Sequence, residues 1–348
     1  GKSNFDISEW MLIRLLDALD DRRATLAMLC KTAVARKVLL HAWKNRVSLR
    51  SSAIRLIDAK KHFAVAADAC LLVCDLARSR RSVDAAVFDH LNDTQPSRVL
   101  GFREGQLVAD VNAYQRSKHL QGRGPYRWRS GIKHDCSRVM AFVRESNRYR
   151  NGLGELVSLE DEHLYPMLKS SDLANGRIES PNRWMLVTQR YVAESTGEIE
   201  ARAPKTWRYL LDHADMLDAR ASSIYRKRPR FAVFGVGDYS FTPWKVASSG
   251  LYKRLEFVKV GSFAGKPIVL DDTGNFLACK TEREADSITA VLNSDLAADF
   301  FSAFVFWDAK RPITVEVLNR LDIVSLAKQM GKQRGLRFRE RQKTLLSQ

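Results

Sequence analysis

The sequence has no uninterrupted apolar stretch near twenty residues, which argues against a membrane-spanning helix. Its start also lacks the basic segment and small-residue cleavage site of a secretory signal peptide. Cysteine is scarce, and no Cys-x-x-Cys pair or Cys/His cluster has the spacing of zinc ligands. We therefore expect no metal site, a cytoplasmic protein and reduced thiols at Cys30, Cys70, Cys74, Cys136 and Cys279.

Positive charge is what the chain has in excess. Its 348 residues include 57 Lys and Arg against 40 Asp and Glu, which gives a net charge of +17. Many phosphate contacts require many cations, so this balance indicates a polyanionic partner such as nucleic acid. A soluble protein that is basic without such a partner is the alternative.

The first ninety residues alternate between helical and strand patterns. Residues 5–19 and 33–43 read as helices, and residues 24–30, 52–57 and 69–74 read as strands. The run at 24–30 is uniformly apolar, which is typical of a strand buried on both faces. Because the connection from residue 57 to residue 69 is too short for a crossover helix, the last two strands are expected to form an antiparallel pair. The pattern therefore predicts an α/β fold.

The local sequence is more specific than this order of elements. Lys-Ser-Asn-Phe-Asp-Ile-Ser-Glu-Trp at 2–10 and Ala-Thr-Leu-Ala-Met-Leu-Cys-Lys-Thr-Ala-Val-Ala-Arg at 24–36 resemble one family. The similar stretch follows the Asn-Pro-Pro-aromatic loop of gamma-type N6-adenine DNA methyltransferases, including type IIG-like proteins of restriction–modification systems. The resemblance implies that residues 1–92 are the closing half of a class I methyltransferase sheet. It also implies that Phe5, Asp6 and Trp10 border the S-adenosylmethionine pocket; the alternative is that Phe5 and Trp10 are core residues.

Phe63 is the residue that the resemblance places nearest to the chemistry. The segment His-Phe-Ala-Val-Ala-Ala-Asp-Ala-Cys-Leu-Leu-Val at 62–73 is similar to the family motif in which an aromatic side chain precedes the final hairpin and stacks on the flipped adenine. Such a base must leave the duplex to be modified, and a stacked aromatic ring contributes about 1–3 kcal/mol per base. The alternative is a loop phenylalanine in the core, and His62 is expected to be a polar neighbour rather than a base.

Two motifs that the family requires are missing. The chain has no glycine-rich cofactor loop, and its nine prolines include no Pro-Pro pair. In the gamma order both motifs would precede Gly1. We therefore expect that the chain alone neither completes the cofactor site nor transfers a methyl group. It would be a fragment of a longer protein, or a second polypeptide would supply the front half.

Residues 93–325 are expected to form an α+β target-recognition domain that follows a turn-rich bridge at 92–101. The segment 122–135 interleaves basic and aromatic residues around three glycines, which suits an approach to phosphates. It resembles the Trp-Arg-Ser-Gly-Ile-Lys-His-Asp run that opens the recognition region of this family. The resemblance nominates Arg127, Trp128, Arg129 and Lys133 as DNA contacts; the alternative is a surface loop anchored by one tryptophan.

Two later segments extend the resemblance. Gly-Val-Gly at 235–237 lacks the third glycine of a dinucleotide fingerprint, so we reject a nucleotide loop there. The run around it instead resembles a segment of the family's specificity domain, which nominates Tyr239, Trp244 and Lys245. A helix at 282–293 capped by Thr281 and a Lys-Arg-Pro-Ile element resemble the family's ending. That element nominates Lys310 and Arg311, and residues 326–348 form a basic tail that could add phosphate contacts.

Three functions follow from these patterns. The first is an adenine-N6 DNA methyltransferase that uses S-adenosylmethionine, acts on double-stranded DNA and depends on an N-terminal catalytic segment or a separate subunit. The alternatives are a non-catalytic DNA-specificity subunit and a fragment of an RNA methyltransferase. The acids Asp299 and Asp308 with Lys310 also resemble the metal site of restriction nucleases, but acid-x-Lys triplets are common by chance.

Overall fold

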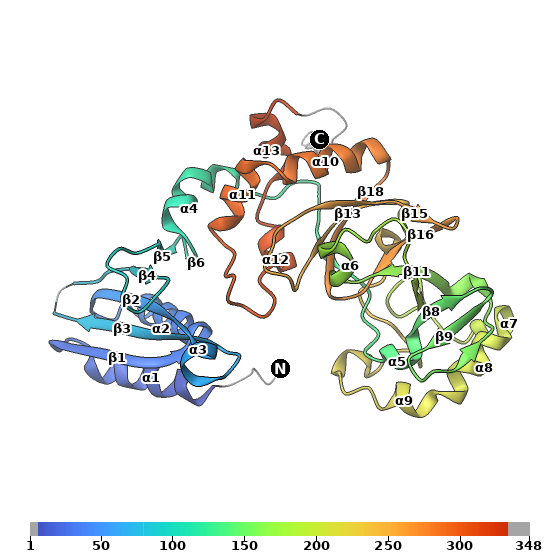
Figure 1. The fold of residues 1–348 in the computed structure, drawn as a ribbon, viewed down its shortest axis with the longest axis horizontal. Helices are drawn as coiled ribbons and strands as arrows, with labels where there is room; N and C mark the ends of the chain where they lie inside the picture. The colour runs from blue at the N-terminus through green and yellow to red at the C-terminus, as the bar shows by residue number, and fades with distance from the viewer. Residues whose placement is uncertain (1–5, 79, 333–348) are drawn as a thin grey trace, which may run out of the picture. The chain divides into compact units, whose positions relative to one another are not determined.

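The computed structural model describes residues 6–78 and 80–332, and Phe5 and most of the basic tail lie outside this part of the chain. The structure divides into two compact units, drawn in Figure 1. The first comprises Gly1–His119 with the returning segment Asp299–Pro312, and the second comprises Leu120–Ala298 with Ile313–Gln348. The functional boundary predicted between residues 92 and 93 therefore does not coincide with a spatial division of the chain.

The first unit is built on a six-stranded mixed sheet with the order β1-β3-β2-β4-β5-β6. Its strands are β1 (Ala24–Lys31), β2 (Leu49–Asp58), β3 (Asp68–Leu76), β4 (Asp84–Phe88), β5 (Arg98–Arg103) and β6 (Gln106–Val108). Its helices are α1 (Ile7–Leu19), α2 (Thr32–Lys44), α3 (Ala59–Phe63) and α4 (Val111–Ser117). Strand β3 runs antiparallel to both β1 and β2, β2 and β4 are parallel, and the remaining pairs are antiparallel.

The predicted antiparallel pair is confirmed as β2 and β3, which are joined through α3. The sequence missed β4, β5 and β6, which extend the sheet beyond β2. The predicted bridge at 92–101 is wrong in its second half, where β5 begins at Arg98. Short strands at a sheet edge carry little periodic signal, because their partners rather than their own pattern decide their pairing.

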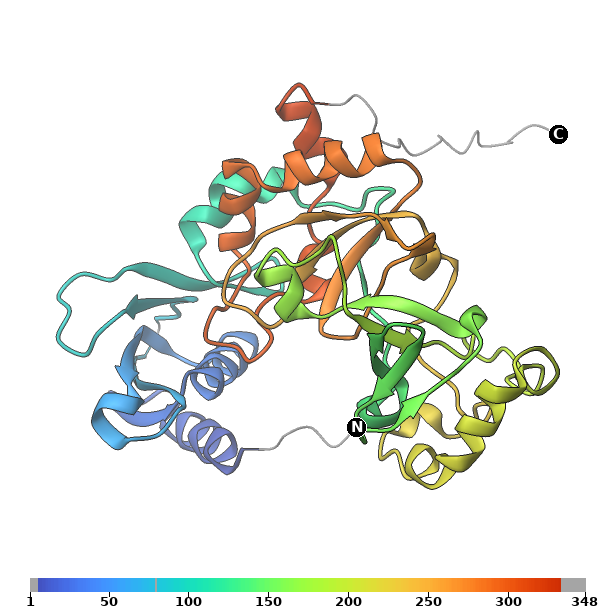
Figure 2. The ribbon, with the colours of Figure 1, turned by 45° about the vertical axis from the view of Figure 1, so that its right-hand side comes forward.

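One face of this sheet is covered by α1 and α2. Residues with even numbers on β1 and β3 point into that core, where Leu26, Cys70 and Leu72 pack against Leu16 of α1 and Val38 of α2. Figure 1 and Figure 2 show both helices, in blue, on the same side of the strands. Strand alternation sends odd-numbered side chains to the opposite face.

The prediction that β1 is buried on both faces is wrong within the described chain. Its burial alternates along the strand, and Leu29 is 50% exposed on the open face. Strand β1 also ends the sheet, with β3 as its one partner among the described strands. Apolar side chains on an open face and an unpaired edge are features that normally require cover.

The second unit contains a six-stranded sheet of order β10-β9-β8-β12-β11-β17, a four-stranded sheet of order β14-β13-β18-β7 and the pair β15-β16. The strands are β7 (Arg129–Ser130), β8 (Ala141–Glu145), β9 (Arg148–Asn151), β10 (Leu156–Val157), β11 (Leu164–Leu168), β12 (Arg183–Leu186), β13 (Trp244–Ser249), β14 (Val258–Val260), β15 (Ser262–Phe263), β16 (Lys266–Pro267), β17 (Val269–Leu270) and β18 (Gly274–Cys279). The helices are α5 (Ser137–Met140), α6 (Ser170–Ala174), α7 (Ile199–Arg202), α8 (Pro204–Asp212), α9 (Ala214–Asp218), α10 (Glu282–Leu292), α12 (Val315–Leu318) and α13 (Ile323–Gln329). Helix α11 (Asp295–Ser302) spans the change from this unit to the segment that returns to the first, and η1 (Lys118–Leu120) spans the earlier change.

The expected mixture of helices and strands in this region is confirmed, and the start of one helix was predicted correctly. Helix α10 has the expected start, where the Thr281 hydroxyl accepts a hydrogen bond from the Glu284 backbone N–H at 3.2 Å. Between residues 204 and 225 the chain forms α8, α9 and the 3₁₀ turn η3 (Ser223–Tyr225). No helix in the described part of the chain is long and apolar enough to cross a membrane.

Candidate functional site

An open hollow of about 540 Å³ lies in the first unit where β1 and β2 end and β3 begins. It is lined by Thr32, residues 56–60, residues 65–69, Asp89, His90 and Asp308. Four of these side chains are aspartates and one is a lysine. Carboxylates accept hydrogen bonds and repel phosphate, so the hollow suits a neutral group with N–H donors or a cation better than an anion.

Phe63 stands beside this hollow on the short helix α3. The Asp58 carboxylate caps the helix by accepting from the Lys61 backbone N–H at 3.0 Å. Ala64 ends it in the left-handed region, with φ of 55°. Because both ends of α3 are fixed, Phe63 is held outward, and its side chain is 52% exposed. The alternative of a phenylalanine in the core is therefore wrong.

The returning segment Asp299–Pro312 contributes to the same hollow. Asp308, which lines it, forms an ion pair with Arg36 of α2, and both side chains are largely buried. The Arg36 guanidinium also lies 4.6 Å from the centroid of the Phe306 ring. Lys310 and Arg311 follow directly in the chain, and both residues are exposed. The fold thus brings two predicted DNA-side cations next to a residue of the hollow.

The predicted cofactor-side residues lie at the start of α1. Asp6 accepts hydrogen bonds from Ser8 and pairs with the Lys31 ammonium at 2.9 Å. The lysine and the serine hold the pKa of the Asp6 carboxyl at about 2. Trp10 is 48% exposed, which contradicts the alternative that it is a core residue. Phe5 lies outside the described residues.

Trp10 belongs to an exposed apolar stripe along α1. Ile7, Met11 and Leu15 share this stripe and are 61%, 48% and 39% exposed, while Leu12 faces the core. Residues spaced by three or four positions lie on one face of a helix. Together with Leu29 on β1, this stripe is apolar surface that the described chain leaves uncovered.

In the second unit the structure brings together Arg129 and Tyr239, which are far apart in the sequence. The guanidinium carbon of Arg129 lies 3.9 Å from the centroid of the Tyr239 ring. Lys133 of the same loop is partly exposed and pairs with Asp135 at 3.4 Å, while Arg127 is exposed. These residues are available to a partner on the surface of the unit.

Trp128 and Lys245 are corrections to the predicted set of DNA contacts. Trp128 is 1% exposed, and its ring packs 5.4 Å from that of Phe257. Lys245 is also 1% exposed and donates to the Thr242 carbonyl at 2.7 Å. Burial lowers the pKa of Lys245 to about 7. Both side chains are buried, so neither is available to contact DNA in this fold.

Packing also accounts for most of the other residues in the segments that contain Trp128 and Lys245. Trp244 is half-buried, and the Lys259 ammonium lies 5.3 Å from the centroid of its ring. A Cβ at Gly131 would lie 2.2 Å from the Asp271 carbonyl oxygen, so a residue without a side chain is needed where these two backbones approach each other. Burial and the nearby Lys169 charge lower the pKa of His134 to about 4, which keeps the imidazole neutral.

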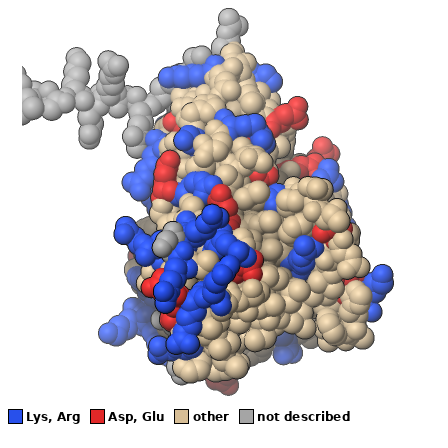
Figure 3. Space-filling model, turned by 90° about the vertical axis from the view of Figure 1, so that its left-hand side faces the viewer, with Lys and Arg blue, Asp and Glu red and all other residues tan. Residues whose placement is uncertain are grey.

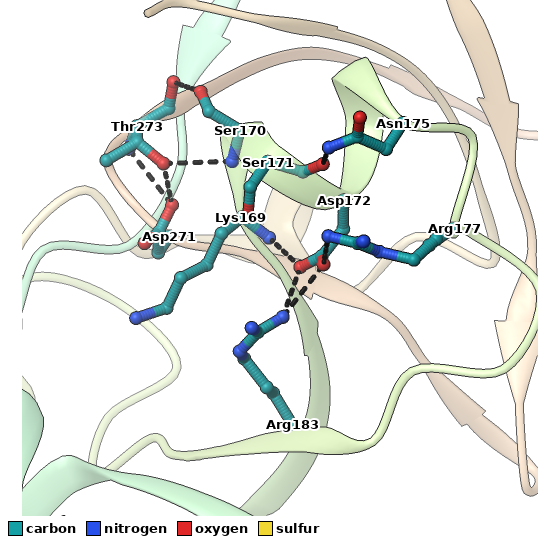
Figure 4. Close-up of polar contacts among 9 residues, drawn as sticks. All are labelled: Lys169, Ser170, Ser171, Asp172, Asn175, Arg177, Arg183, Asp271 and Thr273. Carbon is teal, nitrogen blue, oxygen red and sulfur yellow. Dashed lines mark hydrogen bonds and ion pairs between the residues drawn. The ribbon is translucent and has the colours of Figure 1, made fainter.

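A polar cluster that the sequence did not single out surrounds Asp172 on α6. Its carboxylate accepts from Nη1 of Arg183 at 2.8 and 2.9 Å and from the Lys169 backbone N–H at 3.0 Å. Arg177 lies 3.5 Å away, and Figure 4 shows both guanidiniums turned toward the carboxylate. Two arginines share one buried aspartate, so the cluster keeps an excess positive charge beside a hollow of about 410 Å³.

The nuclease-like arrangement of acids is not assembled as a metal site. Asp299 accepts from Nε of Arg116 at 3.1 Å, and Asp308 is paired with Arg36. Within residues 6–78 and 80–332, no group of three or more His, Cys, Asp or Glu side chains is placed to hold a metal ion. The five cysteines, all within the described residues, are buried and are not joined in disulfides, and burial raises the pKa of the Cys74 thiol to about 12.

Comparison of the whole structure with solved proteins finds a similar fold in one of them. The type IIL restriction-modification enzyme MmeI, solved in complex with DNA, superposes with a TM-score of 0.54 at 10% identity, over 91% of this chain and 42% of that chain. The type IIG restriction endonuclease BpuSI aligns over 97% of this chain and 45% of its own, with 11% identity and a TM-score of 0.34. The chain therefore spans less than half the length of either solved protein.

Sequence comparison gives the family. No family model matches the chain. The type II methyltransferase M.NspV of a Nostoc species is 46% identical over 329 residues, which cover 94% of this chain and 68% of that relative. The chain belongs to the family of type II DNA methyltransferases of restriction–modification systems.

Proposed function

We propose that the chain supplies the target-base and DNA-binding parts of an adenine-N6 DNA methyltransferase. The observation that carries the proposal is Phe63, an aromatic ring held outward beside a hollow at the carboxyl ends of β1 and β2. In open α/β sheets, ligands bind in crevices at this edge of the strands. An adenine removed from the duplex would stack on Phe63, and its amino group would face carboxylates of the hollow rather than phosphate-binding cations.

The first unit supports the assignment of β1, β3 and β2 to the closing strands of a class I methyltransferase sheet. An antiparallel β3 between β1 and β2 is the arrangement that this interpretation requires. The open edge of β1, the exposed Leu29 and the apolar stripe of α1 would be covered by the part of the sheet that carries the cofactor loop and the Asn-Pro-Pro-aromatic motif. That part would be an N-terminal catalytic segment or a separate methyltransferase subunit.

S-adenosylmethionine would supply the methyl group and a cationic sulfonium. Trp10 fits a place beside it, because an exposed indole can stack on an adenine ring or face a cation. Asp6 fits less well as a direct contact, because Ser8 and Lys31 already bond its carboxylate oxygens. We propose that Asp6 positions the first turn of α1 and that Trp10 contacts the cofactor.

DNA would be held by residues of both units. In the first unit the candidates are Lys310 and Arg311, which follow Asp308 of the hollow. In the second unit they are Arg127, Arg129, Lys133, Tyr239 and Trp244. The Asp172 cluster adds Arg177 and Arg183, whose shared carboxylate fixes them toward a phosphate oxygen. A non-catalytic specificity subunit would use the same DNA contacts without the chemistry.

Methyl transfer into DNA tests the proposal. The chain is incubated with labelled S-adenosylmethionine and methyl-free genomic DNA, alone and together with the part of M.NspV that this chain does not match. We expect label in N6-methyladenine when this chain is combined with the part of M.NspV that lies outside the match, which covers 68% of that relative, and less label with Phe63→Ala. Absence of label in DNA, with tight duplex binding retained, would favour the specificity subunit. Preferential binding of RNA over duplex DNA of equal length would overturn the proposal.

A further inference from the structure

Seven arginines gather at the edge of the first sheet that lies opposite the hollow. The register pairs Leu76 of β3 with both Ala24 of β1 and Leu49 of β2, so the starts of β1 and β2 and the end of β3 meet there. The loops at this edge carry the basic rim: Arg22, Arg23, Arg46, Arg50, Arg78, Arg80 and Arg81. All seven residues are exposed. Figure 3 shows a dense group of Lys and Arg side chains on this side of the molecule.

Hydrogen bonds join the three loops that carry the basic rim. Nε of Arg78 donates to the Asp21 carbonyl at 3.1 Å, which ties the loop after β3 to the turn before β1. The Ser48 backbone N–H donates to the Asp20 carboxylate at 2.8 Å, which ties the turn before β2 to the same place. The Ser82 backbone N–H donates to the Leu49 carbonyl at 2.7 Å. The loops that carry these arginines are therefore held in fixed positions relative to one another.

The acids at this edge leave most of the guanidinium charge unbalanced. Asp20 and Asp21 accept hydrogen bonds from Ser48, and Asp75 accepts from the Thr25 and Ser51 hydroxyls. Among the described residues, the ion pair formed by the rim is Arg50 with Asp75, at 3.8 Å. Seven arginines against these three aspartates leave a net charge of +4. Uncompensated cations so close together repel one another unless an anion binds between them.

A single bound group cannot contact both the basic rim and the hollow. They stand at opposite ends of strands of eight to ten residues, roughly 23–30 Å apart at about 3.3 Å per residue. The hollow is lined by four aspartates and one lysine, whereas the basic rim consists of arginines, with the exposed Lys44 near Arg46. A guanidinium offers a planar set of donors that matches two oxygens of one phosphate. Duplex DNA presents about one charge per 1.7 Å, so several phosphates fall within the span of three strands.

We propose that the basic rim binds the phosphate backbone of a DNA segment other than the one whose base is held at Phe63. This goes beyond the proposed methyl transfer, because it gives the first unit a second, sequence-independent DNA contact. The protein would then hold two duplex segments at once. An acidic protein surface is the competing occupant, and DNA is favoured because the family acts on that polyanion.

The experiment uses a variant that keeps the bonds between the loops. Arg22, Arg23, Arg80 and Arg81 are changed together to Gln, and the matched control carries Lys at the same four positions. Affinity for a mixed-sequence duplex is measured over a salt series, and energy transfer between two differently labelled duplexes reports bridging. Thermal unfolding of both variants checks the fold.

We expect wild type to bridge two duplexes and the Gln variant to bind one. Each lost phosphate contact should reduce the slope of log K against log salt by about 0.9. The Lys control should keep most of the slope, because its charge is unchanged. An unchanged slope and unchanged bridging in the Gln variant would overturn the inference and leave an acidic protein as the occupant. Equal loss in the Lys control would also overturn it. Binding of one duplex and methyl transfer to a base held at Phe63 are measured in separate experiments, so the two proposals can fail independently.

Discussion

Arg129 and Tyr239, which are 110 positions apart in the sequence, form a stacked pair in which the guanidinium carbon lies 3.9 Å from the ring centroid. A cation over an aromatic face contributes about 0.5–1 kcal/mol at an exposed site. The ring also holds the guanidinium in one orientation, which lowers the entropy lost when it binds a phosphate.

Arg129→Gln should therefore weaken duplex binding several-fold, and Tyr239→Leu should weaken it less, because the charge remains. Fluorescence anisotropy with a labelled duplex measures both. Arg208→Gln is the matched control, since Arg208 of α8 is an exposed arginine paired with Asp212 at 3.0 Å. Equal losses at positions 129 and 208 would show that total charge alone sets the affinity.

Phe63→Ala should reduce methyl transfer by about five-fold to a hundred-fold, which corresponds to loss of about 1–3 kcal/mol of base stacking. Thermal stability should stay within about 0.5 kcal/mol of wild type, because the ring is half exposed and packs on little. Phe63→Trp should retain most activity. Val83→Ala, which removes another exposed apolar side chain of the same unit, should leave methyl transfer unchanged. A large drop in melting temperature with Phe63→Ala would instead mean that the ring is structural.

Asp308→Asn should destabilise the first unit by about 1–3 kcal/mol, because it leaves the largely buried Arg36 guanidinium without its carboxylate. Lys310→Ala should change stability little, since that side chain is exposed. Denaturant unfolding measures both. If the acids formed a nuclease site, both substitutions would abolish DNA cleavage by the complete restriction–modification system; we expect cleavage to persist with Lys310→Ala.

Lys245→Met should raise stability near neutral pH and flatten its dependence on pH. The folded lysine has a pKa of about 7, against 10.5 for the exposed side chain. Between those values the unfolded state binds more protons, so the stability of wild type rises with pH. At pH 7 and below, wild type carries the full cost of burying an ammonium ion, which methionine does not. Unfolding free energies at pH 6, 7.5 and 9 measure the difference, and parallel curves for the two proteins would contradict this account.

If the Asp172 cluster binds phosphate as proposed, Arg177→Gln should weaken binding of all duplexes by a similar factor and lower the salt slope by about 1. Its exposed position means that stability should change little. Asp172→Asn should lower stability as well as affinity, since it leaves Arg183 without the carboxylate that accepts both hydrogen bonds from its Nη1. A change in target sequence with Arg177→Gln would show that it reads a base.

The predicted antiparallel pair, the cap of α10 and the likeness to DNA methyltransferases could all be read from the sequence. Each depends on local information: the short connection from residue 57 to residue 69, a threonine before an amphipathic run, or a motif in chain order. Phe63 belongs with them, because the cap at Asp58 and the left-handed Ala64 that hold it outward are its near neighbours in the chain. The role of Phe63 in stacking a base stays a prediction.

Burial was the property that the sequence could not supply. Trp128 and Lys245 stand in basic, aromatic segments typical of a DNA surface, but both are buried, Trp128 against Phe257 and Lys245 beside Phe276. A residue's exposure depends on which distant segments pack over it, and those contacts are set by the whole chain. For the same reason β1 looked like a strand with two buried faces, although α1 and α2 cover only one face within the described chain.

By itself, then, the sequence determined the family, the order of the longer helices and strands from α1 to β3 and a chain rich in cations, because these follow from local pattern and composition. Only the tertiary structure decided where the charges lie. It returned Asp308 to the hollow beside Arg36, placed Arg129 over Tyr239 and gathered seven arginines from three loops at one edge of a sheet. Strand pairing and packing bring together residues that are remote in the chain, and the sites depend on those contacts.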